Sequence, residues 1–114
     1  MVFRKSETVM RKLYDMNDYN LLASNVSGWA GSHHHQHDEH CVVVQGYILM
    51  ATYKNKKVKI DRLQKDEEMT IPAGVAHNLY LPVGSQILLS KNTDWLPSPD
   101  LALILKMLAL NKEI

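Results

Sequence analysis

The sequence predicts a single all-β domain, an antiparallel sandwich or barrel, that ends in one C-terminal helix. With 114 residues the chain has the size of one domain, which we place over residues 1–114. Its middle part holds several short β-rich segments separated by turn residues, as is typical of antiparallel all-β folds. An apolar run over residues 101–110 then follows a helix-start signal.

The strand-like segments begin near residue 42. Residues 42–53 are rich in β-branched and aromatic side chains and contain no proline, so we expect a strand there. Asn55 tolerates a positive φ and predicts a hairpin turn after that strand. Val58, Ile60 and Leu63 alternate with charged residues, as in a half-exposed strand. Further short strands are expected over residues 69–71, 77–81 and 86–90.

The two ends of the chain differ from this pattern. Ser98 is a candidate N-cap, Pro99 suits the first helical position, and Asp100 places an acid in the first turn. We therefore expect a helix over about residues 99–111, apolar almost all round, that packs on the domain or on a second subunit. Residues 6–16 could form another short helix.

Composition and charge exclude several classes of partner. A net charge of +1 gives no field that would attract nucleic acid or an anionic membrane. The single cysteine, Cys41, excludes an intramolecular disulfide and fits a reducing compartment. No segment has the layout of a signal peptide, and no apolar run is long enough to span a bilayer. We therefore expect a cytoplasmic protein that binds neither nucleic acid nor membrane.

Histidines gather in one short tract. Five of the six lie between residues 33 and 40, and His77 follows a proline-glycine turn; a histidine-rich tract is itself a metal-binding signal. On a strand, His33 and His35 face the same side. Fully extended chain would carry Glu39 about 13 Å from His35, whereas ligands lie about 2 Å from a metal. The chain must therefore turn within residues 36–38 if Glu39 is to join the histidines.

Two segments resemble the two motifs of the cupin superfamily. The first motif is matched by His33, His35, Glu39 and Gly46, and the second by Pro72, Gly74 and His77. Together they cover about residues 29–90. The resemblance implies a small antiparallel β-barrel of the double-stranded β-helix, jelly-roll type, over about residues 20–95. It also implies that one divalent transition metal, such as Fe, Mn, Ni or Zn, is held by His33, His35, Glu39 and His77.

The sequence departs from the family pattern at three positions. Ser27 stands where the leading glycine is expected, Asp66 where the second motif opens with glycine, and Leu81 where that motif closes with asparagine. These positions shape turns and do not bind metal, so they affect the expected turn geometry more than the expected site.

A second register would take His35, His37 and Cys41 as the ligand triplet. It would supply a softer thiolate ligand but would lose the spacing from Glu39 to Gly46. For Cys41 a buried, small apolar role is favoured over that of a nucleophile, because no third group that would orient a Cys-His pair is evident.

Three further residues are candidates for moving protons. Tyr47 and Tyr53 have the same odd parity as the ligands and could line the pocket, although core packing is the common fate of such side chains. His37 lies in the expected turn next to the ligands.

The leading functional hypothesis is an enzyme. A metal with open positions would polarise an oxygen of a small polar molecule, plausibly a carbohydrate derivative, and so favour isomerisation or epimerisation. One alternative is an Fe(II) dioxygenase, since open positions on iron bind dioxygen. Another is a non-catalytic module that binds a small molecule, and a third is a metal carrier that uses His34, His37 and His40.

A homodimer is also expected. On a strand over residues 41–53, Val42, Val44, Ile48 and Met50 would lie on the side away from the pocket. A strand that is apolar on both faces must be covered on both. In a domain of this size, a second subunit is an economical cover, and small cupins, which the chain resembles, commonly dimerise through a sheet.

Overall fold

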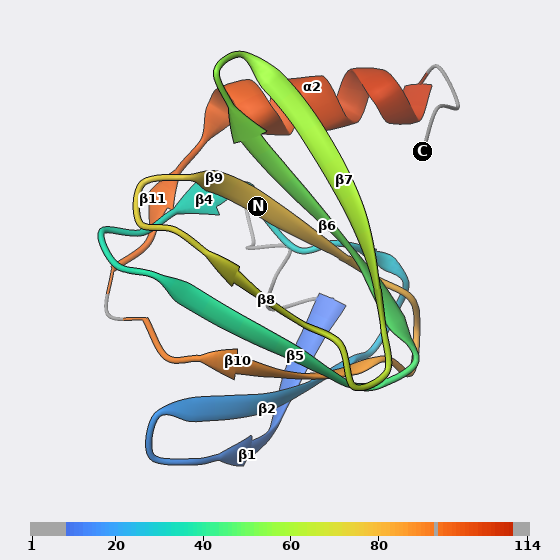
Figure 1. Ribbon diagram of the computed structural model, residues 1–114. Helices are drawn as coiled ribbons and strands as arrows, with labels where there is room; N and C mark the ends of the chain where they lie inside the picture. The colour runs from blue at the N-terminus through green and yellow to red at the C-terminus, as the bar shows by residue number, and fades with distance from the viewer. Residues whose placement is uncertain (1–8, 93, 111–114) are drawn as a thin grey trace, which may run out of the picture.

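Two antiparallel sheets face each other in the computed structural model, which describes residues 9–92 and 94–110 (Figure 1). The five-stranded sheet has the order β1 (Met10–Asp15), β2 (Tyr19–Ser24), β10 (Gln86–Ser90), β5 (Glu39–Gln45), β8 (Glu68–Ile71). The six-stranded sheet has the order β11 (Leu96–Pro97), β4 (His33–His34), β9 (Ala76–Leu81), β6 (Tyr47–Lys54), β7 (Lys57–Gln64), and β3 (Gly28–Trp29) also pairs with β9. The predicted all-β fold of jelly-roll type is thereby confirmed.

The main core lies between the two sheets. It is built from alternate residues of strands in both sheets, because successive side chains of a strand point to opposite faces. Its fully buried members are Cys41, Val43, Ile48, Met50, Ile71, Leu81 and Ile87. Burying one aliphatic side chain of this size contributes about 1.5–3 kcal/mol to folding, so this layer is what holds the sheets together.

The single strand expected over residues 42–53 is wrong, because the chain breaks at Gly46. This glycine has a φ of +76°, and the chain passes there from the five-stranded to the six-stranded sheet. The pairing of β5 with β10 also shifts register at its end, between Ile87 and Gln86. Inward-facing residues are therefore odd-numbered before Gly46 and even-numbered after it. Ile48 and Met50, expected on the outer side, lie in the core.

The C-terminal helix is confirmed as α2 (Pro99–Leu110), with Asp100 in its first turn. It lies over the outer face of the six-stranded sheet (Figure 1), where Leu101 and Leu105 are buried against Ala51. Other apolar side chains of the helix, such as Leu103, remain exposed. No helix among the residues that the structure describes is long and apolar enough to cross a membrane.

The short helix expected over residues 6–16 is wrong for residues 10–15, although residue 9 is helical. Residues 10–15 form β1, which pairs with β2, and residues 6–8 lie outside the described part of the chain. Pairing along β2 satisfies the backbone of this segment and lets Met10 pack against the main core, which outweighs a weak local helix preference.

Gly46 is the position at which we predict the largest cost of adding a methyl group. A Cβ there would lie 3.3 Å from Ser85 Oγ and 3.5 Å from Ser85 Cα. Gly84 has a similar φ of +87° but nothing within 4 Å of its added Cβ, so Gly84→Ala measures the backbone strain alone, about 1–2 kcal/mol. Gly46→Ala should lower the free energy of unfolding further, as measured by urea denaturation. Equal losses in the two variants would contradict the argument.

Candidate metal centre

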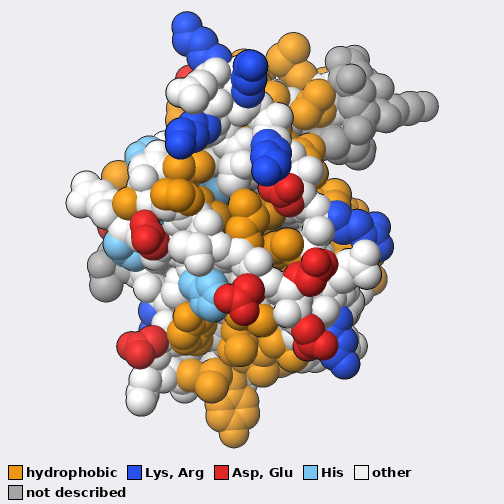
Figure 2. Space-filling view, viewed as in Figure 1, with side chains coloured by type: hydrophobic (Ala, Val, Ile, Leu, Met, Phe, Trp, Pro, Cys, Tyr) orange, Lys and Arg blue, Asp and Glu red, His pale blue; other side chains and the backbone are white. Residues whose placement is uncertain are grey.

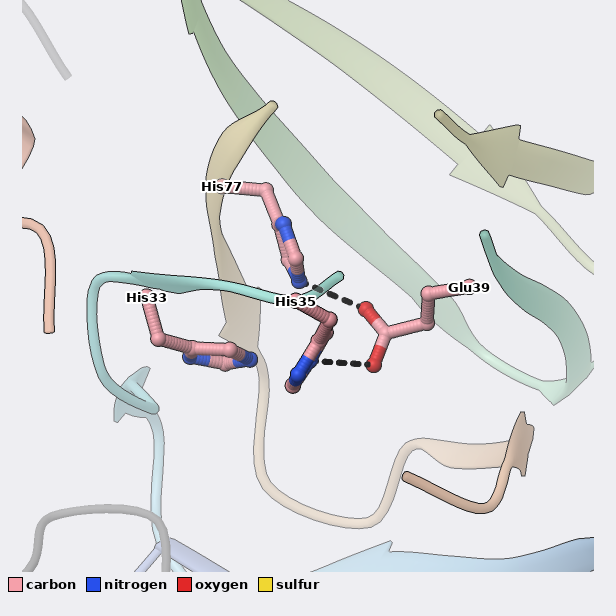
Figure 3. A group of neighbouring side chains, drawn as sticks. All are labelled: His33, His35, Glu39 and His77. Carbon is pink, nitrogen blue, oxygen red and sulfur yellow. Dashed lines mark ion pairs between the residues drawn. The ribbon is translucent and has the colours of Figure 1, made fainter. Parts of the chain in front are cut away.

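The four residues of the two motifs lie together at one end of the barrel (Figure 3). His33 comes from β4, His35 follows directly after it, Glu39 begins β5, and His77 comes from β9, where it pairs with His33. Each offers one nitrogen or oxygen atom, and these atoms lie within 4.8 Å of one another. The chain bends at residues 36–37, as the sequence required for Glu39 to reach the histidines.

Backbone carbonyls fix the orientation of all three imidazoles. The Nδ1–H groups donate to the carbonyls of neighbouring or facing segments: His33 to Gly31 at 2.8 Å, His77 to Val75 at 2.9 Å, and His35 to Asp94 at 2.6 Å. A carbonyl oxygen can only accept, so the hydrogen of each ring must be on Nδ1. The lone pair of each Nε2 is then available as a metal ligand.

Two polar atoms at the centre of the group lack a hydrogen-bond partner among the described residues, and a bound metal would be a partner for both. Glu39 Oε2 and His77 Nε2 are buried and lie 2.6 Å apart, yet neither has a hydrogen bond among the described residues. Both side chains are 2% exposed or less. Buried polar atoms without a partner are costly, and two that converge on one point are what a bound cation would satisfy. The donor set of three imidazoles and one carboxylate suits a transition metal.

Burial and mutual interactions shift the pKa values of three members of the group. Burial lowers the pKa of His33 to about 4, and the neighbouring His77 acts in the same direction. Burial alone would raise the pKa of Glu39, but His35 and His77 hold it well below its usual range. Burial alone would lower the pKa of His35, but hydrogen bonding and charge from Glu39 raise it. An ionised Glu39 is the form in which a carboxylate would bind a metal.

A segment outside both motifs supports three of the four residues. Asn92 Nδ2 donates to Glu39 Oε1 at 2.6 Å, the Asp94 carbonyl accepts from His35, and the Trp95 ring stacks on His33 with centroids 5.2 Å apart. Sequence reasoning missed Asn92 and Asp94, because they follow the last predicted strand in a loop that matches no motif. Their only local signal is a run of polar residues behind a strand.

A pocket of about 290 Å³ opens at this group. Its walls, apart from the motif residues, include Met10, Asn20, Leu89, Asn92, Asp94 and Trp95. A larger cleft of about 520 Å³ lies beside α2 and is lined mostly by apolar side chains such as Trp29 and Ala102. The described lining of that cleft includes no histidine, cysteine or carboxylate, so we place the candidate site in the smaller pocket.

The structure does not bring the two tyrosines to this pocket. Tyr53 packs on the outer face of the six-stranded sheet with residues of α2, and the ring of Tyr47 lies under the guanidinium of Arg62 at 3.9 Å. Their odd parity pointed inward only on the assumption that one strand continued through Gly46. His37 does lie beside the group: its side chain is 41% exposed, and its Nδ1 is 3.1 Å from Asp94 Oδ1.

Cys41 is fully buried in the main core. It does not belong to the group of four candidate ligands. Two of the other histidines, His34 and His40, also point away from the group. His34 Nδ1 pairs with Ser98 Oγ at 2.9 Å, and His40 lies between Tyr19 and Glu68. The second register, which required Cys41 as a ligand, does not match this placement.

The three departures from the family motifs are accommodated locally. Asp66 has a φ of +73°, so it takes the conformation for which a glycine would be preferred, and aspartate tolerates it better than most residues. Ser27 Oγ accepts from the backbone N–H of Val83 at 2.9 Å, and Leu81 is fully buried in the core. None of the three contributes to the four-residue group.

Comparisons with known proteins were made at the levels of sequence and structure. No model of a protein family matches the chain, and no curated protein matches it. A cupin-2 domain-containing protein from Shewanella frigidimarina has a similar structure, with a TM-score of 0.55 and 27% identity over 73% of this chain and 78% of that one. A cupin superfamily protein from Desulfitobacterium hafniense reaches a TM-score of 0.58 with 14% identity, over 82% and 84% of the two chains. Hydroquinone 1,2-dioxygenase from Sphingomonas sp. TTNP3 gives 0.54 with 14% identity, over 75% and 66%.

Cys41 should be inert in the folded protein. Burial, with a smaller contribution from the charge of Glu39, raises the pKa of its thiol to about 12, and the thiolate is the reactive form. We therefore expect no reaction with a thiol-specific disulfide reagent under native conditions and one thiol per chain after denaturation, because the chain has one cysteine. Rapid native labelling would contradict the burial of Cys41.

Proposed function

From the cupin fold of this chain, and from the four ligand residues at one end of its barrel, we propose a metal-dependent enzyme that acts on a small polar, oxygen-bearing molecule. A carbohydrate derivative that is isomerised or epimerised is the substrate class we favour. The observation that carries the proposal is the convergence of His33, His35, Glu39 and His77. A divalent ion bound there would polarise a substrate oxygen and lower the cost of removing a neighbouring proton.

The pocket beside the candidate metal ligands suits a small molecule that donates hydrogen bonds. Its volume of about 290 Å³ suits a small molecule. One of its wall residues, Asn20, carries a buried oxygen, Oδ1, without a hydrogen-bond partner among the described residues. Such oxygens accept from hydroxyl groups, and the apolar side chains of Met10 and Leu89 complete the wall. A hydroxylated molecule meets both requirements.

His37 is the proposed proton-transfer residue. Its ring stacks on His35 with centroids 5.7 Å apart, and its Nε2–H donates to Asn92 Oδ1 beside Glu39. Of the three residues proposed from the sequence for this role, His37 is the one that contacts residues of the pocket wall, namely Asn92 and Asp94. An imidazole that is partly open to solvent can exchange protons with water and with a bound ligand.

Metal content is the direct test of the proposal. Protein purified without added metal should contain about one divalent transition-metal ion per chain by elemental analysis, and His77→Ala should lose it, because one of the four ligands is gone. His34→Ala is the matched control, since His34 pairs with Ser98 and not with the ligand group. A metal-free wild type that also fails to take up metal on reconstitution would exclude the proposed chemistry.

Two alternatives use the same pocket differently. An Fe(II) dioxygenase is supported only by likeness of fold to a hydroquinone 1,2-dioxygenase, and oxygen uptake by the iron-loaded protein would favour it. A non-catalytic binding module would hold a ligand and release it unchanged. Recovery of the ligand unchanged after incubation with the metal-loaded protein would favour the binding module over an enzyme.

We also propose a cytoplasmic homodimer that forms through the outer face of the five-stranded sheet. Leu21, Leu88 and Val42 lie opposite one another across β2, β10 and β5, so their side chains share one face. They alternate with core residues and are only half buried, and Figure 2 shows apolar side chains gathered on this side of the molecule. A second copy of the chain would bury this row.

The dimer proposal predicts that Val42→Lys gives a monomer, because the new charge would have to be desolvated at the interface. Leu103→Lys is the control, since it places the same charge on the exposed side of α2. Sedimentation velocity separates the two species. A wild-type protein that is monomeric at micromolar concentration, or a dimer that Leu103→Lys alone disrupts, would rule out this interface.

A further inference from the structure

Asn92 lies outside the motifs, and its side chain makes polar contacts with two of the four ligand residues. Its Nδ2 donates to Glu39 Oε1 at 2.6 Å and lies 3.2 Å from His35 Nε2. Its Oδ1 accepts from His37 Nε2. The amide thus stands between the exposed imidazole of His37 and the buried carboxylate of Glu39.

The partners of this amide fix its orientation. A carboxylate oxygen can only accept a hydrogen bond, so the NH₂ group must face Glu39 and the amide oxygen must face His37. Hydrogen bonds to an ionised carboxylate are about twice as strong as those between neutral groups. Since Glu39 is 1% exposed, the acceptor of this hydrogen bond is a buried carboxyl group.

The two oxygens of Glu39 are therefore not equivalent. Oε1 accepts from Asn92 and lies 3.3 Å from His35 Nε2, whereas Oε2 has no hydrogen bond among the described residues and lies 2.6 Å from His77 Nε2. The contact between Asn92 Nδ2 and His35 Nε2 uses a lone pair that a metal would take, so it must give way on metal binding. The hydrogen bond to Oε1 has no such conflict and can persist.

We infer that Asn92 is a positioning residue for the metal ligand Glu39. It holds Oε1 in a hydrogen bond, so that Oε2 would be the oxygen of Glu39 that faces a bound metal. This inference rests on the proposed metal-dependent function, and it concerns a residue that lies in neither motif. Groups that orient metal ligands in this way typically contribute 10–100-fold to metal affinity.

The test is a double-mutant cycle on metal affinity. Asn92→Leu keeps the approximate volume and removes the donor, and Asn92→Ala serves as a second variant if Asn92→Leu does not fold. Each is made in the wild-type and in the Glu39→Gln background, and the dissociation constant for Cu²⁺ is measured by competition with a chromophoric chelator. Copper is the tightest-binding divalent ion of the first row, so the weakened variants remain measurable.

We expect Asn92→Leu to weaken binding 10–100-fold in the wild-type background and less than about threefold with Glu39→Gln, because the partner it positions is then altered. Ser90→Ala is the control and should leave the affinity unchanged: Ser90 lines the same pocket, but its hydroxyl accepts from the backbone of His40. Circular dichroism melting curves of the metal-free variants verify the fold.

Two results would overturn the inference. One is an unchanged affinity in Asn92→Leu, and the other is an equal loss in both backgrounds, which would mean that Asn92 acts on the fold and not through Glu39. Both leave the wild-type protein binding metal, so they are distinct from a failure of the proposed function. A wild-type protein without measurable affinity for any divalent metal would remove both.

Discussion

The candidate metal centre depends on three hydrogen bonds from imidazole Nδ1–H groups to backbone carbonyls. Because Gly31, Val75 and Asp94 supply these carbonyls, the orientation of each ring is set by the path of the main chain and not by neighbouring side chains. The strands bring the histidines into one place, and the carbonyls decide which nitrogen of each ring faces inward. Substituting a neighbouring side chain would leave these three acceptors in place, so the orientation of the rings depends on the backbone path more than on the side chains around them.

The second constraint is that the chain must pass from one sheet to the other to enclose the core, and it does so at Gly46. The chain changes sheets at this residue, and the inward face changes from odd to even positions across it. This places the candidate ligand Glu39 and the core residues Cys41 and Val43 on one strand, while β6 presents Ile48 and Met50 to the same interior. The outer face of β6 is then free to pack against α2 through Ala51.

Much of this arrangement follows from the sequence. Motif spacing predicted the four residues that converge, and turn chemistry and alternation predicted the short strands and the start of α2 at Pro99. The prediction of inward-facing residues assumed that odd and even positions keep their faces across Gly46. They do not, so Tyr47 and Tyr53 were expected on the wrong face. The support from Asn92 and Asp94 could not be predicted, because a loop residue is placed by the tertiary fold and carries no periodic signal.

The pairing of His33 with His77 across β4 and β9 has a consequence for the way the protein would acquire the proposed metal. The candidate ligands come from segments far apart in the chain, so an unfolded or half-folded chain has no complete site. Closing the loop between these segments costs entropy, which the contacts of the folded barrel offset. A metal would thus bind the native state selectively. At a free concentration 100 times its dissociation constant it would add about 2.7 kcal/mol to stability. Metal supply would then help to determine how much folded protein a cell maintains.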